Sequence, residues 1–495
     1  MADMTLSDWQ ARAAILNIEG RAFIDGQYTP TASGETFACV SPIDGRKLAD
    51  ISLAGADDVE RAVAVARKAF DSGVWAQRAP RARKDTLTRV ADQGRAHADE
   101  LALLESLDMG KPVADAASVD VSGAAYAIEW YGEAIDKIGG EVAPVDPKLL
   151  GLVTREAIGV VAAVVPWNFP IMMASWKIAP ALAAGNSVIL KPSEKSPLTA
   201  IRLAALARDA GIPDGVFQVL PGAGDTGRLL ALHMDIDCLA FTGSTGVGKL
   251  IAGYAAQSNL KRVWLELGGK SANIVLDDCP NLLRAARSAA GGIFFNQGQV
   301  CSAGSRVLVH NRIKDRFVEA LAEAARGWQP GNPLDPDTTM GAIVDRIQFD
   351  KVRGYIDAGR RESTLLFGGN AAEPVKNGLY IEPTAFLTEP GSVIEREEIF
   401  GPVLSIVGFD DVNDAVRLAN NSIYGLAGAV WTSNLSTAHT VSRALRAGTV
   451  WVNCYDEGGD MNMPFGGFKQ SGNGRDKSLH ALEKYTELKS TVIKL

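Results

Sequence analysis

The chain has 495 residues, of which 47% are hydrophobic and 22% are charged, a composition typical of a globular protein with more than one core. Its net charge of −8 argues against nucleic acid as the main partner, because proteins that bind phosphate backbones usually carry a basic surface. The most apolar run, Ala157–Val165, is too short to span a bilayer. We therefore expect two or three domains, no nucleic-acid partner and no membrane partner.

The cysteines indicate the compartment. They are scattered and include no C-x-x-C pair, which argues against a disulfide framework and a zinc site; they are Cys39, Cys238, Cys279, Cys301 and Cys454. The first ten residues contain acids and lack a basic stretch followed by an apolar one, so we expect no signal peptide. These features predict a cytoplasmic protein without a metal site.

The N-terminal region begins with turn signals and continues with helical patterns. Asp-Gly pairs predict hairpin-like turns within residues 23–28 and 41–48. Apolar residues at three- and four-residue spacing then predict helices over residues 56–70, 80–111 and 122–138.

From about residue 152, apolar strand candidates alternate with helical patterns. The strands are predicted over residues 153–165, 187–192, 215–222, 238–244 and 263–269, with helices between them. Strands that are apolar throughout and separated by helices indicate a parallel sheet covered on both faces. Ligands of such sheets bind at the carboxyl ends of the strands.

A second α/β region is predicted from residue 271 to about residue 454, with helices near 311–327 and 414–425. The tail, residues 486–495, reads as a terminal strand with no later strand to pair with. Because an unpaired strand edge tends to associate with another chain, a partner subunit is plausible.

Two glycine patterns follow strands of the first predicted sheet. Gly222–Gly227 fits the G-x-G-x-x-G fingerprint of dinucleotide binding, although a tight turn between strand and helix needs the same glycines. Gly243–Lys249 matches the P-loop pattern, but Leu250 stands where an NTPase needs a hydroxyl for Mg²⁺. Ser244 and the following helix N-terminus still suit a pyrophosphate. A P-loop kinase or ATPase therefore remains the alternative from another class.

The segment FFNQGQVCSAGSR, Phe294–Arg306, presents Cys301 among small and amide side chains. A lone cysteine is most often a small buried apolar residue. A thiol is also intrinsically nucleophilic, and a helix N-terminus or a cationic cofactor beside it would raise its thiolate fraction. The histidines lie outside any motif-like context, and they are His97, His233, His310, His439 and His480. A histidine base for Cys301 is therefore not indicated.

Two strand ends carry polar side chains that could act with this cysteine. Glu266 ends an apolar strand beside a glycine turn, where an acid costs desolvation energy unless it is used or paired. Asn168 lies between Pro166 and Pro170, and a held amide can donate to a developing oxyanion. Nucleophile, base and oxyanion donor are thus predicted to converge at one edge of the sheet.

Seven segments occur in an order that resembles the NAD(P)-dependent aldehyde dehydrogenases: PWNFP, KPSEKSP, FTGSTGVGK, LELGGKS, NQGQVCSAGSR, EEIFGPV and PFGGFKQSGNG. The resemblance covers almost the whole chain. It implies an α/β fold with a Rossmann-type parallel-sheet cofactor domain, an α/β catalytic domain and a small β oligomerisation element. The implied boundaries are 1–137 and 158–267 for the NAD-binding domain, 268–476 for the catalytic domain, and 138–157 and 477–495 for the oligomerisation element. A homo-oligomer, dimer or tetramer, is implied as well.

The resemblance also implies roles for single residues. Cys301 attacks the aldehyde, Asn168 and the Cys301 backbone N–H hold the oxyanion, and Glu266 activates the water that hydrolyses the thioester. The implied cofactor contacts are Val165, Trp167, Lys191, Glu194, Gly224, Gly243, Ser244, Gly248, Glu398 and Phe400. The pattern at Gly222 is then expected near the adenine instead of the pyrophosphate. Because the Glu194 carboxylate would accept from a ribose 2′-OH and repel a 2′-phosphate, we expect NAD to be preferred over NADP.

The substrate pocket implied by the resemblance contains Phe169, Trp176, Asp456, Glu457 and Phe465. The acids between Asp456 and Asp460 are either a solvated loop or a negative collar that attracts a cationic substrate. The run 459–489 resembles the bacterial polyamine-pathway branch, the γ-glutamyl-γ-aminobutyraldehyde and guanidinobutyraldehyde dehydrogenases. We therefore expect an ω-amino, guanidino or γ-glutamylamino aldehyde, and a general aliphatic or betaine-type aldehyde is the alternative.

Overall fold

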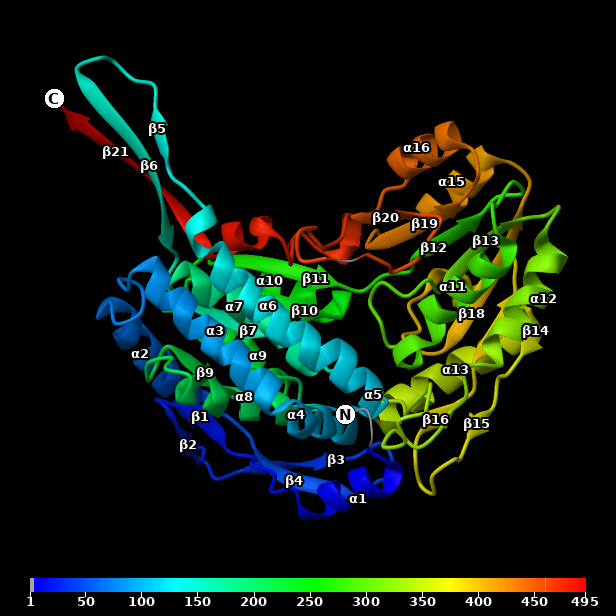
Figure 1. The fold of residues 1–495 in the computed structure, drawn as a ribbon, viewed down its shortest axis with the longest axis horizontal. Coiled ribbons are helices and arrows are strands. Elements are labelled where there is room, and N and C mark those ends of the chain that lie inside the picture. The colour runs from blue at the N-terminus through cyan, green and yellow to red at the C-terminus, as the bar shows by residue number, and fades with distance from the viewer. Residues whose placement is uncertain (1–3, 459) are drawn as a thin grey trace.

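The computed structural model describes residues 4–458 and 460–495, so the first three residues of the N-terminal segment lie outside it. Two large sheets with helices packed against them form the body, and an arm of three strands projects from it (Figure 1). The predicted α/β class with mostly parallel sheets is confirmed.

The first sheet has the strand order β11-β10-β7-β8-β9-β1-β2, and its strands from β11 to β9 run parallel. Its bounds are β1 (Ala22–Ile24), β2 (Gln27–Thr29), β7 (Val160–Val164), β8 (Ser187–Lys191), β9 (Phe217–Val219), β10 (Cys238–Gly243) and β11 (Arg262–Leu267). The hairpin predicted within residues 23–28 is β1 and β2, which turn through Asp25 and Gly26 in left-handed conformations. A second antiparallel pair, β3 (Thr36–Val40) and β4 (Lys47–Ser52), accounts for the turn signal in residues 41–48.

Helices cover both faces of this sheet because its central strands are apolar on both sides. In β7, Val160 and Ala162 pack into one core while Val161 and Ala163 pack into another, as the two-residue period of a strand requires. The first face carries α2 (Ala56–Asp71), α9 (Gly224–Leu232) and α10 (Thr245–Gln257). The second carries α3 (Pro80–Ala96), α4 (Ala98–Met109), α6 (Ser122–Ala134), α7 (Pro170–Ala184) and α8 (Leu198–Asp209).

The strand predicted over residues 153–165 is wrong as a single element. It divides at Ile158 and Gly159 into β6 (Leu149–Ala157) and β7, and only β7 joins the first sheet. Gly159 takes a φ of +133°, a conformation that side chains of L-residues rarely adopt, so the glycine permits the change of direction. The continuous apolar character of the segment hid this break.

The arm consists of β6 paired with β5 (Glu141–Ala143) on one side and with β21 (Thr486–Lys494) on the other. The predicted terminal strand therefore has a partner within its own chain, contrary to the expectation of an unpaired end. Figure 1 shows the arm extending away from both large sheets, with the C-terminus near its tip.

The second sheet has the order β14-β17-β18-β13-β12-β19-β20 and is parallel except for the β14–β17 pair. Its bounds are β12 (Ala272–Val275), β13 (Arg306–His310), β14 (Thr364–Phe367), β17 (Thr384–Leu387), β18 (Val403–Phe409), β19 (Ala427–Trp431) and β20 (Thr449–Val452). The helices of this region are α11 (Leu282–Phe294), α12 (Lys314–Ala325), α13 (Arg346–Glu362), α14 (Val393–Arg396), α15 (Val412–Asn420) and α16 (Leu435–Ala444). The second α/β region predicted from the sequence is thus confirmed.

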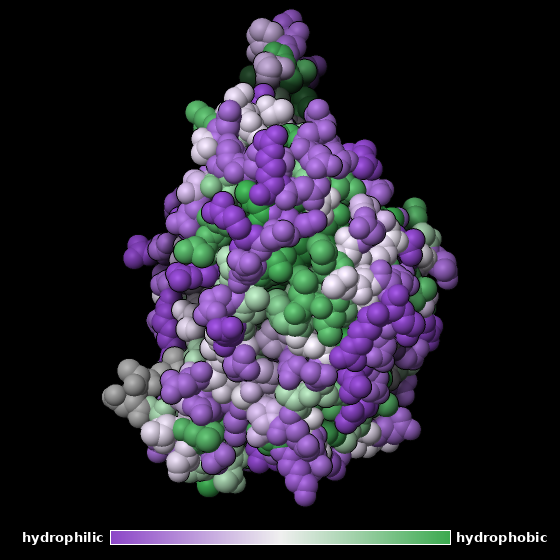
Figure 2. All heavy atoms as spheres, turned by 90° about the vertical axis from the view of Figure 1, so that its right-hand side faces the viewer, coloured by the Kyte–Doolittle hydropathy of each residue, from purple (hydrophilic) through white to green (hydrophobic). Residues whose placement is uncertain are grey.

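The surface of the second-sheet side is mostly hydrophilic, with an apolar area near its centre and the arm above it (Figure 2). Among residues 4–458 and 460–495, no helix is both long enough and apolar enough to cross a membrane.

Candidate active site

Polar and glycine residues gather where the parallel strands of the first sheet end. Trp167 and Asn168 follow β7, Lys191 ends β8 and Gly222–Gly227 follows β9. Gly243 ends β10, Ser244 follows it, and Glu266 lies near the end of β11. Because parallel strands present their carboxyl ends at one edge, five segments distant in sequence meet there. The second sheet contributes Cys301 across this edge.

Cys301 lies where two cavities meet. A cavity of about 140 Å³ is lined by Cys301 together with Trp167, Asn168, Gly243, Ser244, Glu266, Glu398 and Phe400. A cavity of about 660 Å³ opens from the other side of Cys301 and is lined by Phe169, Trp176, Asp456, Glu457 and Phe465, among others. A group bound in one cavity can therefore reach the same sulfur as a group bound in the other.

The loop that carries Cys301 is held in an unusual conformation. After α11 the chain passes through Asn296, Gln297 and Gly298 with φ values of +47°, +56° and +69°. Asn296 Nδ2 donates to the Asn168 carbonyl oxygen at 3.0 Å, and Asn168 Nδ2 donates to the Gln299 carbonyl oxygen at 2.9 Å. Left-handed backbone at non-glycine positions costs free energy and is often found at functional sites. These bonds fix the Asn168 amide beside the cysteine loop, with its second N–H left for another acceptor.

The glycine turn after Glu266 brings the two sheets together. A side chain at Gly269 would meet the Cys301 carbonyl oxygen at 2.7 Å, and one at Gly268 would meet the Glu398 carboxylate at 2.2 Å. The Gly269 N–H donates to Glu398 Oε1 at 2.9 Å. Both glycines of the LELGGK segment are therefore required by close approach.

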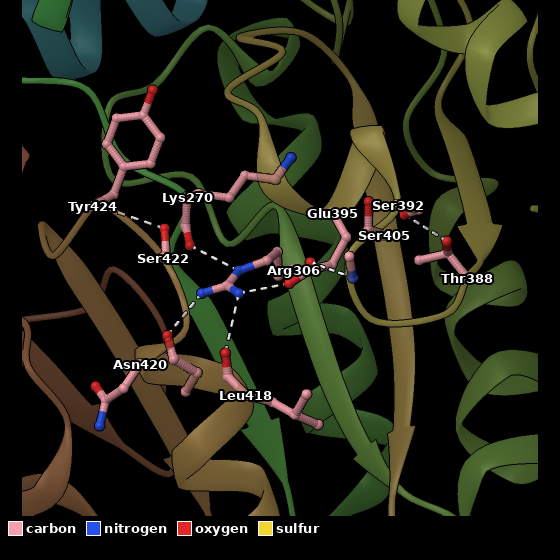
Figure 3. Close-up of polar contacts among 12 residues, drawn as sticks. Lys270, Arg306, Thr388, Ser392, Glu395, Ser405, Leu418, Asn420, Ser422 and Tyr424 are labelled. Atoms are coloured by element: carbon pink, nitrogen blue, oxygen red, sulfur yellow. Dashed lines mark hydrogen bonds and ion pairs between the residues drawn. The ribbon is translucent and has the colours of Figure 1, made fainter. Parts of the chain in front are cut away.

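Arg306 ties this turn to the second sheet (Figure 3). Its guanidinium donates to the Lys270 carbonyl oxygen at 3.0 Å, to Glu395 Oε1 at 2.7 Å and to the Leu418 carbonyl oxygen at 3.3 Å. Burial, with the positive charge of Arg306 nearby, lowers the pKa of Lys270 to about 7. A buried arginine with this many acceptors fixes the segments on both sides of the catalytic loop.

Glu266 is a buried acid, 2% exposed, and neither of its carboxylate oxygens has a hydrogen-bond partner among the described residues. Burial raises its pKa to about 8, against the opposing charge of Lys177. The Lys177 ammonium itself pairs with Asp476, and Lys484 pairs with the second oxygen of Asp476, all of them buried. A carboxylate poised near neutral pH with free oxygens has the properties of a general base.

The surroundings of Cys301 disfavour the thiolate. Burial, followed by the negative charges of Glu266 and Asp456, raises the pKa of the thiol well above its ordinary value. The residue follows the end of α11 instead of beginning a helix, so a helix N-terminus does not favour the thiolate here. The proton must leave to a nearby base, and of the two carboxylates that line the small cavity, Glu266 and Glu398, the charge of Glu266 acts more strongly on the thiol.

The small cavity and the strand ends beside it fit a dinucleotide. Ser244 caps α10, with Val247 N donating to its Oγ at 3.4 Å, and a Cβ at Gly246 would meet no atom within 4 Å. The first turn of α10 is therefore open to an anion. Trp167 and Phe400 pack edge to face with ring centroids 5.2 Å apart, and they form an aromatic wall.

Several of the predicted cofactor contacts lie outside the small cavity. Lys191 Nζ lies 3.4 Å from Glu194 Oε2 at the end of β8, and the Val165 N–H donates to the Lys191 carbonyl oxygen at 3.1 Å. Gly224 begins α9, and Gly248 packs closely on Leu267. They lie along the same sheet edge, at the ends of the neighbouring strands. Leu250 is exposed on α10 and offers no oxygen to a metal ion.

The large cavity is mainly apolar, and the five predicted pocket residues line it. Trp176 and Phe465 have ring centroids 5.8 Å apart, and Phe169 lies 6.2 Å from Phe295. The acidic segment does not form a uniform collar. Glu457 pairs with Arg284 at 3.2 Å, and Asp460, which does not line the cavity, accepts from the Tyr126 hydroxyl at 3.0 Å.

Sequence reasoning missed the buried ions around the site. Lys177 is the one charged residue of an otherwise apolar helix, α7, and that contrast was the available signal. Asp476 and Lys484 lie in a polar tail, where charges usually face solvent, and the sequence offered no such signal. Lys351 and Gln348 of α13 also line the small cavity.

Other chemistries lack support in the described part of the chain. Neither cavity is lined by a histidine, and His97, His233 and His480 contact Gln93, Glu60 and Glu483. No group of His, Cys, Asp or Glu side chains within residues 4–458 and 460–495 could hold a metal ion.

Comparison with known proteins places the geometry in context. A family model described as aldehyde dehydrogenase family matches residues 28–491. The NADP/NAD-dependent aldehyde dehydrogenase PuuC of Escherichia coli (strain K12) is 54% identical over 494 residues, 99% of each chain. The structure of γ-glutamyl-γ-aminobutyraldehyde dehydrogenase from Burkholderia cenocepacia J2315 is 69% identical, with a TM-score of 0.98 over 99% of this chain and 100% of that one. A mutant of the P. syringae indole-3-acetaldehyde dehydrogenase AldA, in complex with NAD⁺ and IAA, is 59% identical, with a TM-score of 0.99 over 100% of both chains.

Proposed function

The chain belongs to the aldehyde dehydrogenase family, and we propose that Cys301, Glu266 and Asn168 carry out its reaction. The protein is an oxidoreductase of the NAD- or NADP-dependent type, and it oxidises aldehydes. The observation that carries the assignment of residues is the position of Cys301 where the small cavity at the strand ends meets the large, mainly apolar cavity. The kinase or ATPase alternative is set aside.

In the first step the Cys301 sulfur attacks the aldehyde carbon. Glu266 takes the thiol proton, because it is the nearby carboxylate whose charge bears most strongly on the pKa of the cysteine. The second N–H of Asn168 Nδ2 and the Cys301 backbone N–H donate to the developing oxyanion. The product is a thiohemiacetal on Cys301.

Oxidation and hydrolysis follow at the same sulfur. Lys191, Glu194 and Ser244 would hold NAD at the strand ends, where it would supply the acceptor for the hydride of the thiohemiacetal carbon, and Cys301 would then carry a thioester. Glu266, after releasing the thiol proton to solvent, takes a proton from a water molecule, and the resulting hydroxide attacks the thioester. The carboxylic acid leaves, and the Cys301 thiolate takes the proton from Glu266, which restores the thiol and the carboxylate. CoA-acylating relatives typically lack this glutamate, so its presence supports hydrolysis.

For the cofactor we propose a preference for NAD over NADP. Glu194 lies beside Lys191 at the end of β8, where a carboxylate suits a ribose 2′-OH and repels a 2′-phosphate. PuuC is described as using both cofactors, so the ratio of the two kcat/KM values is the quantity to measure. Comparable values would overturn the preference.

For the substrate we propose an aldehyde of polyamine breakdown whose far end carries an amino, guanidino or γ-glutamylamino group. The support is the similarity to PuuC and to the γ-glutamyl-γ-aminobutyraldehyde dehydrogenase, together with Asp456 in the wall of the large cavity. A panel of kcat/KM values for amino, aliphatic and aromatic aldehydes tests it. A clear preference for hexanal or benzaldehyde would favour a general aldehyde dehydrogenase instead, and the AldA similarity makes indole-3-acetaldehyde a necessary member of the panel.

For the assembly we propose a homo-oligomer, dimer or tetramer, in the cytoplasm. The arm exposes Leu488, Val492 and Ile493, an apolar edge strand that a second copy would cover. The arm segments, 138–157 and 477–495, then form an oligomerisation element beside a cofactor domain (1–137 and 158–267) and a catalytic domain (268–476). Light scattering would measure the oligomeric state, and a monomer at micromolar concentration would contradict the proposed homo-oligomer.

A further inference from the structure

Two residues of opposite charge line the large cavity, and we propose that they select its substrate. Asp456 and Lys477 bind the zwitterionic α-amino-acid end of the aldehyde, with Asp456 accepting from the ammonium and Lys477 donating to the carboxylate. This inference rests on the proposed function, because the γ-glutamylamino aldehydes are the members of that substrate class that carry such an end.

The cavity offers few other charges. Among the described residues, the acidic and basic side chains in its wall are Asp456, Glu457 and Lys477. Glu457 is engaged with Arg284 at the exposed rim. The remaining wall is largely apolar, and it includes Phe169, Met172, Trp176, Trp451 and Phe465. A charged substrate end is therefore matched at Asp456 and Lys477, while an alkyl segment lies along the apolar wall.

The surroundings of Lys477 distinguish a zwitterion from a simple cation. Lys477 is 8% exposed, and its Nζ lies 5.5 Å from the centre of the Trp176 ring. The acids that act on it are Asp456 and Asp460. A substrate whose far end is only an ammonium would be attracted by Asp456 and repelled by Lys477, so the two effects oppose each other. An end with both charges is attracted by both residues.

Asp456 has access to the cavity while protein atoms surround it. Its side chain is exposed, and it lines the cavity. The surrounding protein atoms raise the pKa of its carboxyl by desolvation, and the nearby Lys477 ammonium opposes that increase. The backbone of both residues is left-handed, with φ of +54° at Asp456 and +62° at Lys477. Aspartate tolerates this conformation, whereas a lysine rarely adopts it, so packing holds Lys477 in a disfavoured conformation.

The test is a set of kcat/KM values for four aldehydes with NAD. They are γ-glutamyl-γ-aminobutyraldehyde, its N-glutaryl analogue without the α-ammonium, its N-(4-aminobutanoyl) analogue without the α-carboxylate, and hexanal. The variants are Asp456→Asn and Lys477→Met. Asp315→Asn and Lys376→Met, both exposed and outside the cavity, are the matched controls.

Lys477→Met is expected to lower kcat/KM for the γ-glutamyl and N-glutaryl aldehydes by about tenfold to 100-fold, the effect of one charged hydrogen bond. Asp456→Asn is expected to lower it by a similar factor for the γ-glutamyl and N-(4-aminobutanoyl) aldehydes. Each loss is measured relative to hexanal in the same variant, because hexanal also reports the effect of the lost Asp456 charge on the pKa of the Cys301 thiol. Melting temperatures close to that of the wild type show that both variants fold. The controls leave all four values unchanged.

A uniform loss across the four aldehydes, hexanal included, would mean that the two residues only support the fold, and it would overturn the inference. Equal kcat/KM values of the wild-type protein for the three charged aldehydes would overturn it as well. The kcat/KM values of the wild-type protein for the charged aldehydes relative to hexanal test the proposed function. The selective losses in Asp456→Asn and Lys477→Met test the roles of these two residues. Either one can therefore fail while the other stands.

Discussion

The two cavities that meet at Cys301 are built in different ways. The small one consists mainly of strand ends and glycine turns, such as Gly243, Glu266 and Gly268. The large one is assembled from segments scattered from Val119 to Lys477, and they include Phe169 and Tyr455. The sheet edges thus fix the reacting groups, while helices and loops that can vary determine which aldehyde enters.

The largest effect is expected from replacing Cys301, the residue at which the two cavities meet. Cys301→Ala is expected to lower kcat by roughly 10⁴-fold or more, because the covalent route is lost. The affinity for NAD, measured by calorimetry, should stay close to that of the wild type, because the strand ends that are proposed to bind NAD are unchanged. Retained dehydrogenase activity in this variant would contradict the mechanism.

The next change acts on the small cavity alone. Glu266→Gln keeps the volume of the side chain and removes its charge, and kcat is expected to fall by about 10²–10⁴, the usual contribution of a general base.

The pH dependence provides the control for this variant. Burial raises the pKa of Glu266 to about 8, so the carboxyl is neutral below that pH and ionised above it. The kcat of the wild-type protein should therefore rise as pH increases through about 8, and Glu266→Gln should lack that rise. An identical pH profile in both proteins would exclude Glu266 as the base.

A smaller effect is expected at the oxyanion. Asn168→Ala removes one donor, and it should lower kcat and kcat/KM together by about 10²–10³, because the bond matters chiefly in the transition state. An increase in KM with an unchanged kcat in Asn168→Ala would argue against Asn168 as an oxyanion donor.

The smallest effect concerns the far end of the cofactor. Glu194→Gln removes a carboxylate 3.4 Å from Lys191, so NADP should gain relative to NAD by roughly tenfold in the ratio of kcat/KM values. Both values come from one enzyme preparation, which controls for its active fraction. An unchanged ratio of the two kcat/KM values would mean that Glu194 does not contact the 2′ position of the cofactor ribose.

The sequence predicted the polar groups beside Cys301 in the small cavity but missed Lys477 in the wall of the large one, for physical reasons. Glu266 and Asn168 lie at the ends of apolar strands, and parallel strands place their ends together. The partners of Lys477 depend on how a C-terminal segment folds back toward α7, which no local pattern encodes. The ion cluster of Lys177, Asp476 and Lys484 joins residues about 300 apart. The split of residues 153–165 at Gly159 was hidden for the opposite reason, since both halves are apolar.

The central claim is that Cys301 carries the acyl group and Glu266 releases it. Mass spectrometry of Glu266→Gln, incubated with an aldehyde and NAD at an alkaline pH, where the Cys301 thiol can ionise without Glu266, tests it most directly. We predict an adduct on the peptide that contains Cys301, with the mass of the aldehyde less two hydrogen atoms, as a thioester requires. An unmodified Cys301 peptide under turnover conditions, or an adduct on another residue, would contradict the claim.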